Sequence, residues 1–88
     1  MLYIAAVVIF VESAFKHGYG EEDFFEVLGA GPLKVRSRRG MKGVYELYGK
    51  NYAGRYLHVA YRREADREVV FHMRDMSPRE KQRYRSCR

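Results

Sequence analysis

The stretch RYLHVAYRREADREVVFHMR, residues 55–74, decides the fold. Apolar and polar residues alternate in both halves of this stretch, as is typical of β-strands that bury one face. We predict strands over Arg55–Arg62 and Glu68–Arg74, with a turn over 63–67 centred on Ala65. Residues 55–74 are therefore expected to form an antiparallel hairpin.

Burial of one face also predicts the register of this hairpin. With Arg62 opposite Glu68, one face is apolar throughout and carries Leu57, Val59, Tyr61, Val69, Phe71 and Met73. The other face then carries Tyr56, His58, Ala60, Val70, His72 and Arg74. A shift of the turn by half a residue would mix both faces, which is costly when one face is buried.

The same period of two predicts further strands over Leu33–Ser37 and Val44–Tyr48. Sequential strands with short connections favour an antiparallel meander of about four strands. If Tyr45 and Leu47 join the apolar face, Glu46 and Tyr48 fall on the polar one.

Two helices flank these strands. The first is expected to begin after Gly20, to bury Phe24, Phe25, Val27 and Leu28, and to end at Gly29. The second is expected to run from Pro78 to about Ser86, because Ser77 and Glu80 have the spacing of a capping box. Helices at the two ends of an antiparallel sheet make the class α+β, and the 88 residues form one domain, 1–88.

The apolar run Leu2–Val11 is half as long as the ~20 residues that cross a bilayer. No basic residue precedes it, so it is a poor signal peptide, and we interpret it as a buried strand. Cys87 is the single cysteine and has no disulfide partner, which agrees with a reducing compartment. We therefore expect a soluble cytoplasmic protein with no membrane partner.

The net charge of +6 is distributed unevenly. Residues 1–32 hold one base against five acids, whereas residues 33–88 hold 16 bases against six acids. A basic excess concentrated in one part of a small fold is typical of proteins that bind polyanions. The alternative is a charged surface that serves only solubility.

The predicted polar face gathers residue types that can cut RNA without a metal: Glu46, Tyr48, Tyr56, His58, His72 and Arg74. RNA supplies its own nucleophile, the 2′-hydroxyl. A His or Glu can move the protons, worth roughly 10²–10⁴-fold in rate, and an Arg or Lys can stabilise charge on the phosphate. A Tyr can stack on an exposed base. The alternative is a solvated sheet surface with fortuitous histidines.

A basic stripe surrounds one turn: Arg36, Arg38 and Arg39, with Lys34 and Lys42 nearby. Such bases can contact phosphates, which adds affinity without sequence choice, or can keep an exposed hairpin soluble. We predict that Arg36, Arg38, Arg39, Arg55 and Tyr56 contact RNA.

Other chemistries have little support. The three histidines are far apart in sequence and lack metal-binding spacing, and no phosphate-binding loop follows a strand. Ser77 is better explained as a helix cap than as a nucleophile. We expect no metal and no cofactor.

Several segments resemble the BrnT toxin family, a branch of the RelE/ParE-like group. They are Lys16-His17-Gly18, Glu21-Glu22 and Glu26-Val27-Leu28; Tyr45-Glu46-Leu47-Tyr48-Gly49 and Ala53-Gly54-Arg55-Tyr56-Leu57; and Met73-Arg74-Asp75-Met76-Ser77 with Glu80 and Tyr84. The similarity covers roughly residues 13–86 in consistent order and spacing.

The resemblance implies a compact RelE-like fold and a ribonuclease that blocks translation. It also implies a neighbouring DNA-binding antitoxin that forms a hetero-oligomer with the toxin, and operator DNA bound through that complex. By position, Lys16, His17 and Arg74 are the matched candidates for RNA chemistry. Lys16-His17-Gly18 could also simply end a helix, and Glu80 has a sufficient role in its capping box.

The sequence thus favours an endoribonuclease in which Arg74 and Lys16 stabilise the phosphate and His17 or His58 moves protons. His72 and Glu46 complete the catalytic candidates. The rivals are a non-catalytic nucleic-acid-binding module and a structural partner of an acidic protein or an antitoxin.

Overall fold

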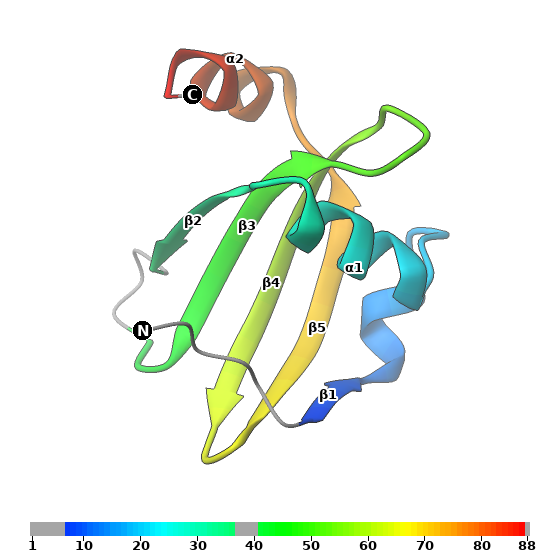
Figure 1. The fold of residues 1–88 in the computed structure, drawn as a ribbon, viewed down its shortest axis with the longest axis vertical. Coiled ribbons are helices and arrows are strands. Elements are labelled where there is room, and N and C mark those ends of the chain that lie inside the picture. The colour runs from blue at the N-terminus through cyan, green and yellow to red at the C-terminus, as the bar shows by residue number, and fades with distance from the viewer. Residues whose placement is uncertain (1–6, 37–40, 88) are drawn as a thin grey trace.

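The computed structural model of the chain describes residues 7–36 and 41–87. Its elements, in order, are β1 (Val7–Phe10), the 3₁₀ turn η1 (Glu12–Phe15), α1 (Glu21–Gly29), β2 (Leu33–Arg36), β3 (Val44–Lys50), β4 (Tyr56–Glu64), β5 (Arg67–Asp75) and α2 (Pro78–Ser86). The strands form one sheet in the order β1-β5-β4-β3-β2 (Figure 1). The predicted α+β class is confirmed.

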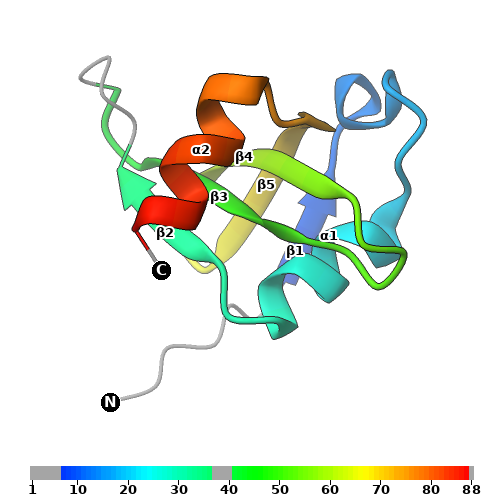
Figure 2. The same cartoon turned by 90° about the horizontal axis from the view of Figure 1, so that it is seen from above.

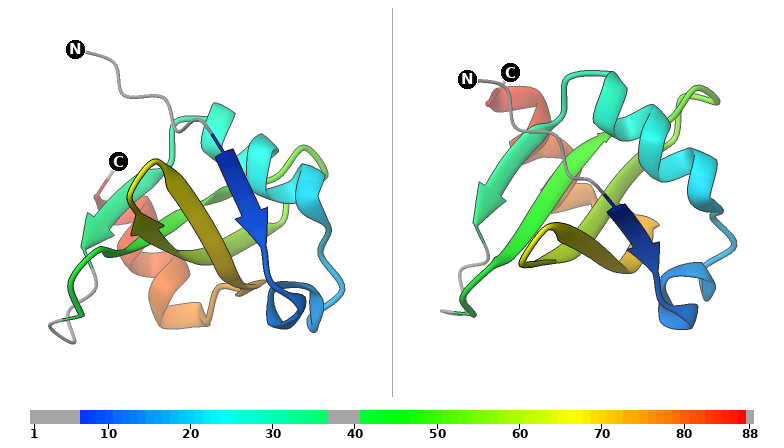
Figure 3. Two further views of the ribbon diagram at one scale, coloured as in Figure 1. Left: turned by 90° about the horizontal axis from the view of Figure 1, so that it is seen from below. Right: turned by 60° about the horizontal axis from the view of Figure 1, so that its bottom comes forward.

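The predicted antiparallel meander corresponds to β2 to β5, which pair in sequence order. β1 adds a fifth strand, parallel to β5, to the meander of about four antiparallel strands that was predicted, so the sheet is mixed (Figure 3). β1 lies within the apolar run predicted as a buried strand, but it is an edge strand, and Val7 is 46% exposed. Residues 2–6 of that run lie outside the described part, as does Ser37 at the end of the predicted strand Leu33–Ser37.

The central hairpin differs from the predicted register because β5 carries a bulge. Val59 pairs with Met73 and Ala60 with His72, but the next pair is Tyr61 with Val70, so Phe71 is extra. The bulge turns Val70 into the core and Phe71 to the opposite face. The assignment of Val69 and Phe71 to the apolar face, and of Val70 to the polar one, was therefore wrong. The turn is also shorter than predicted, since β4 ends at Glu64 and β5 begins at Arg67.

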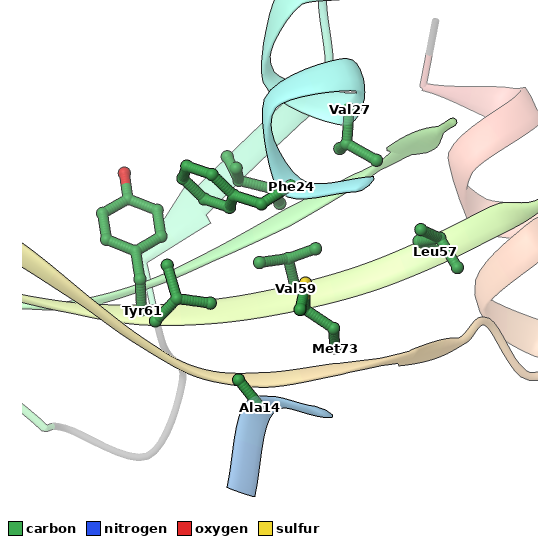
Figure 4. Packing of buried hydrophobic residues seen from close by; sticks show 9 residues of the cluster. Ala14, Phe24, Val27, Leu57, Val59, Tyr61 and Met73 are labelled. Carbon is green, nitrogen blue, oxygen red and sulfur yellow. The ribbon is translucent and has the colours of Figure 1, made fainter. Parts of the chain in front are cut away.

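The core lies between α1 and one face of the sheet (Figure 4). Phe24 and Val27 point from α1 onto the strands, where Leu47, Leu57 and Met73 are buried. α1 approaches β3 so closely that a Cβ on Gly49 would lie 3.1 Å from Cγ1 of Val27. Two predicted core residues are not buried, because they lie on the outer side of α1: Phe25 is 48% and Leu28 44% exposed.

Polar contacts hold the loop between β3 and β4 against α1. The Asp23 carboxylate accepts hydrogen bonds from the Gly20 backbone N–H (2.8 Å) and from Nδ2 of Asn51 (3.0 Å). Glu26 accepts from the Tyr52 backbone N–H at 2.8 Å. Asp23 therefore caps the N-terminus of α1. Asp23 and Glu26 together fix the position of α1 over the sheet.

α2 lies across the opposite face of the sheet from α1 (Figure 2). It begins with the predicted capping box: Oγ of Ser77 accepts from the Glu80 backbone N–H at 3.2 Å, and Glu80 accepts from the Ser77 N–H at 2.9 Å. Tyr84 fixes the helix to the sheet, since it is buried and packs edge-on against Tyr56 at 5.9 Å. α1 thus packs over one face of the sheet, and α2 lies at one end of the other face (Figure 1).

Candidate functional site

The sheet face under the start of α2 contains a hollow of about 410 Å³. It is lined by Met41, Val44, Glu46, His58, Ala60, Phe71, His72, Arg74 and Glu80. Strand alternation brings Glu46, His58, His72 and Arg74 together here, because each occupies the non-core face of β3, β4 or β5. Four of the six predicted catalytic residues therefore lie around one hollow, which we call the histidine hollow.

Glu46 and His58 form a fixed pair in its wall. Oε1 of Glu46 lies 2.7 Å from Nε2 of His58 and accepts a second hydrogen bond, 2.9 Å long, from the hydroxyl of Tyr48. The Tyr48 ring packs against His58 with 4.8 Å between centroids. Burial and the contact with Glu46 raise the pKa of Tyr48, so its hydroxyl remains a donor at neutral pH.

This pairing limits what His58 can do. An ionised carboxylate only accepts hydrogen bonds, so Nε2 of His58 carries the hydrogen. The side chain is 9% exposed, and its Nδ1 is buried with no hydrogen-bond partner among the described residues. His58 therefore suits orientation of its neighbours better than direct proton exchange with a substrate.

The three histidines form a row. The ring of His72 lies 5.3 Å from that of His58 and 5.8 Å from that of His17, measured between centroids. His17 is exposed and comes from the loop after η1, where the N–H of Gly18, at φ +90°, donates to the Phe15 carbonyl at 3.1 Å. The Lys16-His17-Gly18 segment thus ends a helical turn, as one alternative held, and also brings His17 to His72.

Burial lowers the pKa of His72 from 6.5, and Coulombic interactions with His58, Arg74, His17 and Lys16 lower it further. At pH 7 the imidazole of His72 is therefore neutral and carries a lone pair. Lys16 is exposed and acts on this ring through its charge. Lys16 and His17, which the resemblance implied, and His72, which the sheet pattern implied, are thus neighbours.

Arg74 lines the histidine hollow but is held by Glu80. Its Nη1 and Nη2 donate to the two carboxylate oxygens at 2.7 and 2.8 Å, and Nη1 also donates to the Asp75 carbonyl at 2.8 Å. The hydrogen bond from Arg74 lowers the pKa of Glu80 to about 2. A guanidinium has five N–H donors, so two remain outside these three bonds.

The predicted RNA-contacting residues do not join the histidine hollow. Arg36 is exposed at the end of β2, while Arg38 and Arg39 lie outside the described residues. Of their basic neighbours, Lys42 is exposed and Lys34 lies over the ring of Tyr45, 4.9 Å from Nζ to the centroid. These bases therefore make no common site among the residues that the structure describes.

Arg55 and Tyr56 line a second hollow, of about 540 Å³, beside α2. It is also lined by Gly54, Asp75, Met76 and Lys81. Lys81 was not predicted from the sequence, and neither were Lys50 and Arg85 near the same tyrosine. The i, i+4 spacing of Lys81 and Arg85 beside Tyr84 could have indicated two of them. The apolar walls of the histidine hollow, formed by Met41, Val44, Ala60 and Phe71, were not predicted either.

Within residues 7–36 and 41–87, no group of three or more His, Cys, Asp and Glu side chains is arranged to hold a metal ion. No described helix has the length and apolar character of a membrane span.

Comparison with known protein families finds no family that matches this chain. Comparison with curated proteins likewise finds no similar sequence.

Proposed function

We propose that the chain is a ribonuclease that cleaves RNA without a metal, by attack of the 2′-hydroxyl on the adjacent phosphate. The observation that carries this proposal is the row of three histidines, in which His58 and His72 line the histidine hollow and His17 lies beside the neutral ring of His72. A phosphate that contacts both His17 and His72 has one imidazole available as base and the other as acid.

In this mechanism His72 accepts the proton of the 2′-hydroxyl, and the 2′-oxygen forms a bond to phosphorus. The bond from phosphorus to the 5′-oxygen breaks, and the His17 imidazolium gives its proton to that oxygen. The products are a 2′,3′-cyclic phosphate and a free 5′-hydroxyl. Proton and charge balance are kept without a cofactor.

The neighbouring residues support these two steps. Lys16 and the two uncommitted N–H donors of Arg74 supply positive charge for the phosphate oxygens. The Glu46–His58 pair holds the ring beside His72 in one orientation. Glu46 and His58 are therefore positioning residues in this proposal.

The biological role follows from the resemblance to BrnT toxins. We propose that the chain has a RelE-like fold and acts in the cytoplasm as the toxin of a type II toxin–antitoxin system. Its substrate is then mRNA, and a DNA-binding antitoxin neutralises it in a hetero-oligomer. The complex, rather than the toxin alone, would contact operator DNA.

The direct test compares cleavage of a defined RNA by the wild type and by His17→Ala and His72→Ala. Each variant should cut roughly 10²–10⁴-fold more slowly, the range for one general acid or base. Arg67→Ala is the control, because Arg67 is exposed at the distant turn of the hairpin. Wild-type rates in both histidine variants would refute the assignment.

A second candidate is a non-catalytic nucleic-acid- or antitoxin-binding module of the same fold. It is favoured by the pairing of Arg74 with Glu80 and of His58 with Glu46, because these two pairs commit four polar side chains of the hollow to contacts within the protein. RNA binding by the wild type without cleavage, and without growth arrest on expression, would select this candidate.

A further inference from the structure

The ring of Tyr56 is surrounded by three positive charges. Nζ of Lys50 lies 5.4 Å from the ring centroid, Nζ of Lys81 lies 5.6 Å from it, and the guanidinium carbon of Arg85 lies 5.2 Å from it. Nη2 of Arg85 also donates a long hydrogen bond, 3.4 Å, to the Tyr56 hydroxyl. The cluster combines residues of β3, β4 and α2.

Packing rather than chance places these charges together. Lys50 is the backbone partner of Tyr56 across β3 and β4. Lys81 and Arg85 are four residues apart on α2, so they share one face of the helix, and buried Tyr84 holds that face against Tyr56. Arg79 and Arg83, also four residues apart, lie on the opposite face.

The charges are not neutralised within the described protein. No ion pair among residues 7–36 and 41–87 involves Lys50, Lys81 or Arg85. Among the described residues, the one carboxylate that lines the second hollow belongs to Asp75, which accepts a hydrogen bond from the Tyr19 hydroxyl. Three cations held together at the cost of mutual repulsion form a site for an anion.

We propose that Lys50, Tyr56, Lys81 and Arg85 form a phosphate subsite for single-stranded nucleic acid, next to the histidine hollow. The inference rests on the proposed function, since it places flanking phosphates of the same strand, one for each cation. Tyr56 and His58 lie two residues apart on one face of β4, about 7 Å along the strand, and the ring of His72 lies a further 5.3 Å from that of His58. A strand whose scissile phosphate lies at His72 and His17 and that runs past His58 therefore presents flanking phosphates near Tyr56.

The subsite is tested with a fluorescent single-stranded DNA oligonucleotide, which lacks the 2′-hydroxyl and so reports binding without cleavage. Its affinity is measured by anisotropy from about 50 to about 200 mM salt. Lys81→Ala/Arg85→Ala should reduce the slope of log affinity against log salt by about 1.4, or 0.7 for each phosphate contact on a single strand. The fall in affinity between about 50 and about 200 mM salt is then about 7-fold smaller in this variant than in the wild type.

Arg79→Ala/Arg83→Ala is the matched control, because it removes the same two charges from the other face of α2 and should leave the slope near the wild-type value. Equal loss of slope in the two double variants would overturn the proposal. Lys50→Ala changes β3 alone and should lower the slope by about 0.7, so the test holds even if α2 variants are poorly folded. An unchanged slope in Lys50→Ala would also count against the subsite.

A poly-glutamate competitor separates nucleic acid from an acidic protein. We expect it to compete weakly and to bind the wild type and Lys81→Ala/Arg85→Ala alike. Strong competition that is lost in this variant would assign the cluster to an acidic peptide and overturn the phosphate subsite. RNA cleavage is scored separately, so loss of the subsite and loss of the ribonuclease proposal are distinguishable.

Discussion

At the scale of single residues, His72 determines how the proposed reaction depends on pH. Its pKa is lowered from 6.5, first by burial and then by the surrounding positive charges. A base must be neutral to accept a proton, so the rate should rise with pH through a value below 6.5 and be independent of this group at pH 7. A pH profile of kcat/KM for a short RNA measures this, and an acid limb above 6.5 would contradict it.

Glu80 gives a second pH effect, this time on stability. The hydrogen bond from Arg74 lowers its pKa from 4.5 to about 2, so the ion pair stabilises the fold above pH ~4.5 and this contribution is lost as the pH falls toward 2. Glu80→Gln should therefore have a lower Tm than the wild type at pH 6, and the difference should shrink below pH ~4.5. A Tm difference that stays constant down to pH 2 would contradict the ion pair.

The sequence indicated some of these residues correctly for a simple reason. The register at the His58 end differs from the predicted one by an even number of residues, so His58, His72 and Arg74 still share a face. Strand periodicity could not place His17 on that face, because His17 lies in a loop. It was predicted only from the resemblance to the BrnT family. The Arg74–Glu80 bond was not predicted, since it joins a strand to the cap of the following helix.

At the scale of elements, the bulge in β5 explains why the register was only partly predicted. One uniform register keeps Leu57, Val59 and Met73 on the core face, but it would place Phe71 there as well and expose Val70. Inserting Phe71 lets each half of the hairpin bury its own apolar residues. A bulge leaves no period of its own in a short strand, so alternation alone could not reveal it.

The first turn of α2 can be tested as an element. Ser77→Ala removes the side chain that accepts the Glu80 N–H at 3.2 Å, and we expect a loss of about 1 kcal/mol in the free energy of unfolding. Ser77→Asp retains a capping oxygen and should restore most of it. Urea unfolding of the three proteins measures the effect, and equal stability of Ser77→Ala and the wild type would show that the cap contributes nothing.

At the scale of the whole molecule, the hydrophobic core between α1 and one face of the sheet stabilises the sheet, whose other face carries the histidine hollow. Phe24 is fully buried, whereas its neighbour Phe25 is 48% exposed. Phe24→Ala should cost about 3–5 kcal/mol, a large part of the 5–15 kcal/mol typical of a domain. Phe25→Ala is the matched control and should cost much less; similar losses in urea unfolding would mean that α1 is oriented differently.

The sequence predicted this two-helix α+β architecture but not the whole sheet. The first strand is short, pairs in parallel with a strand more than fifty residues away, and lies at an edge. A parallel partner distant in sequence leaves no local signal, which is why β1 was interpreted as a buried strand and not counted in the meander. The same long-range contact sets the direction of the chain into η1 and so places His17 beside His72.

The most direct measurement of the central claim is the identity of the cleavage products. A DNA oligonucleotide containing one ribonucleotide is incubated with the purified chain in the presence of EDTA, and the fragments are analysed by mass spectrometry. The account predicts one cut, 3′ to the ribonucleotide, with a 2′,3′-cyclic phosphate and a 5′-hydroxyl, and almost none with His72→Ala. Absence of cleavage by the wild type, or a cut in the all-DNA strand, would contradict it.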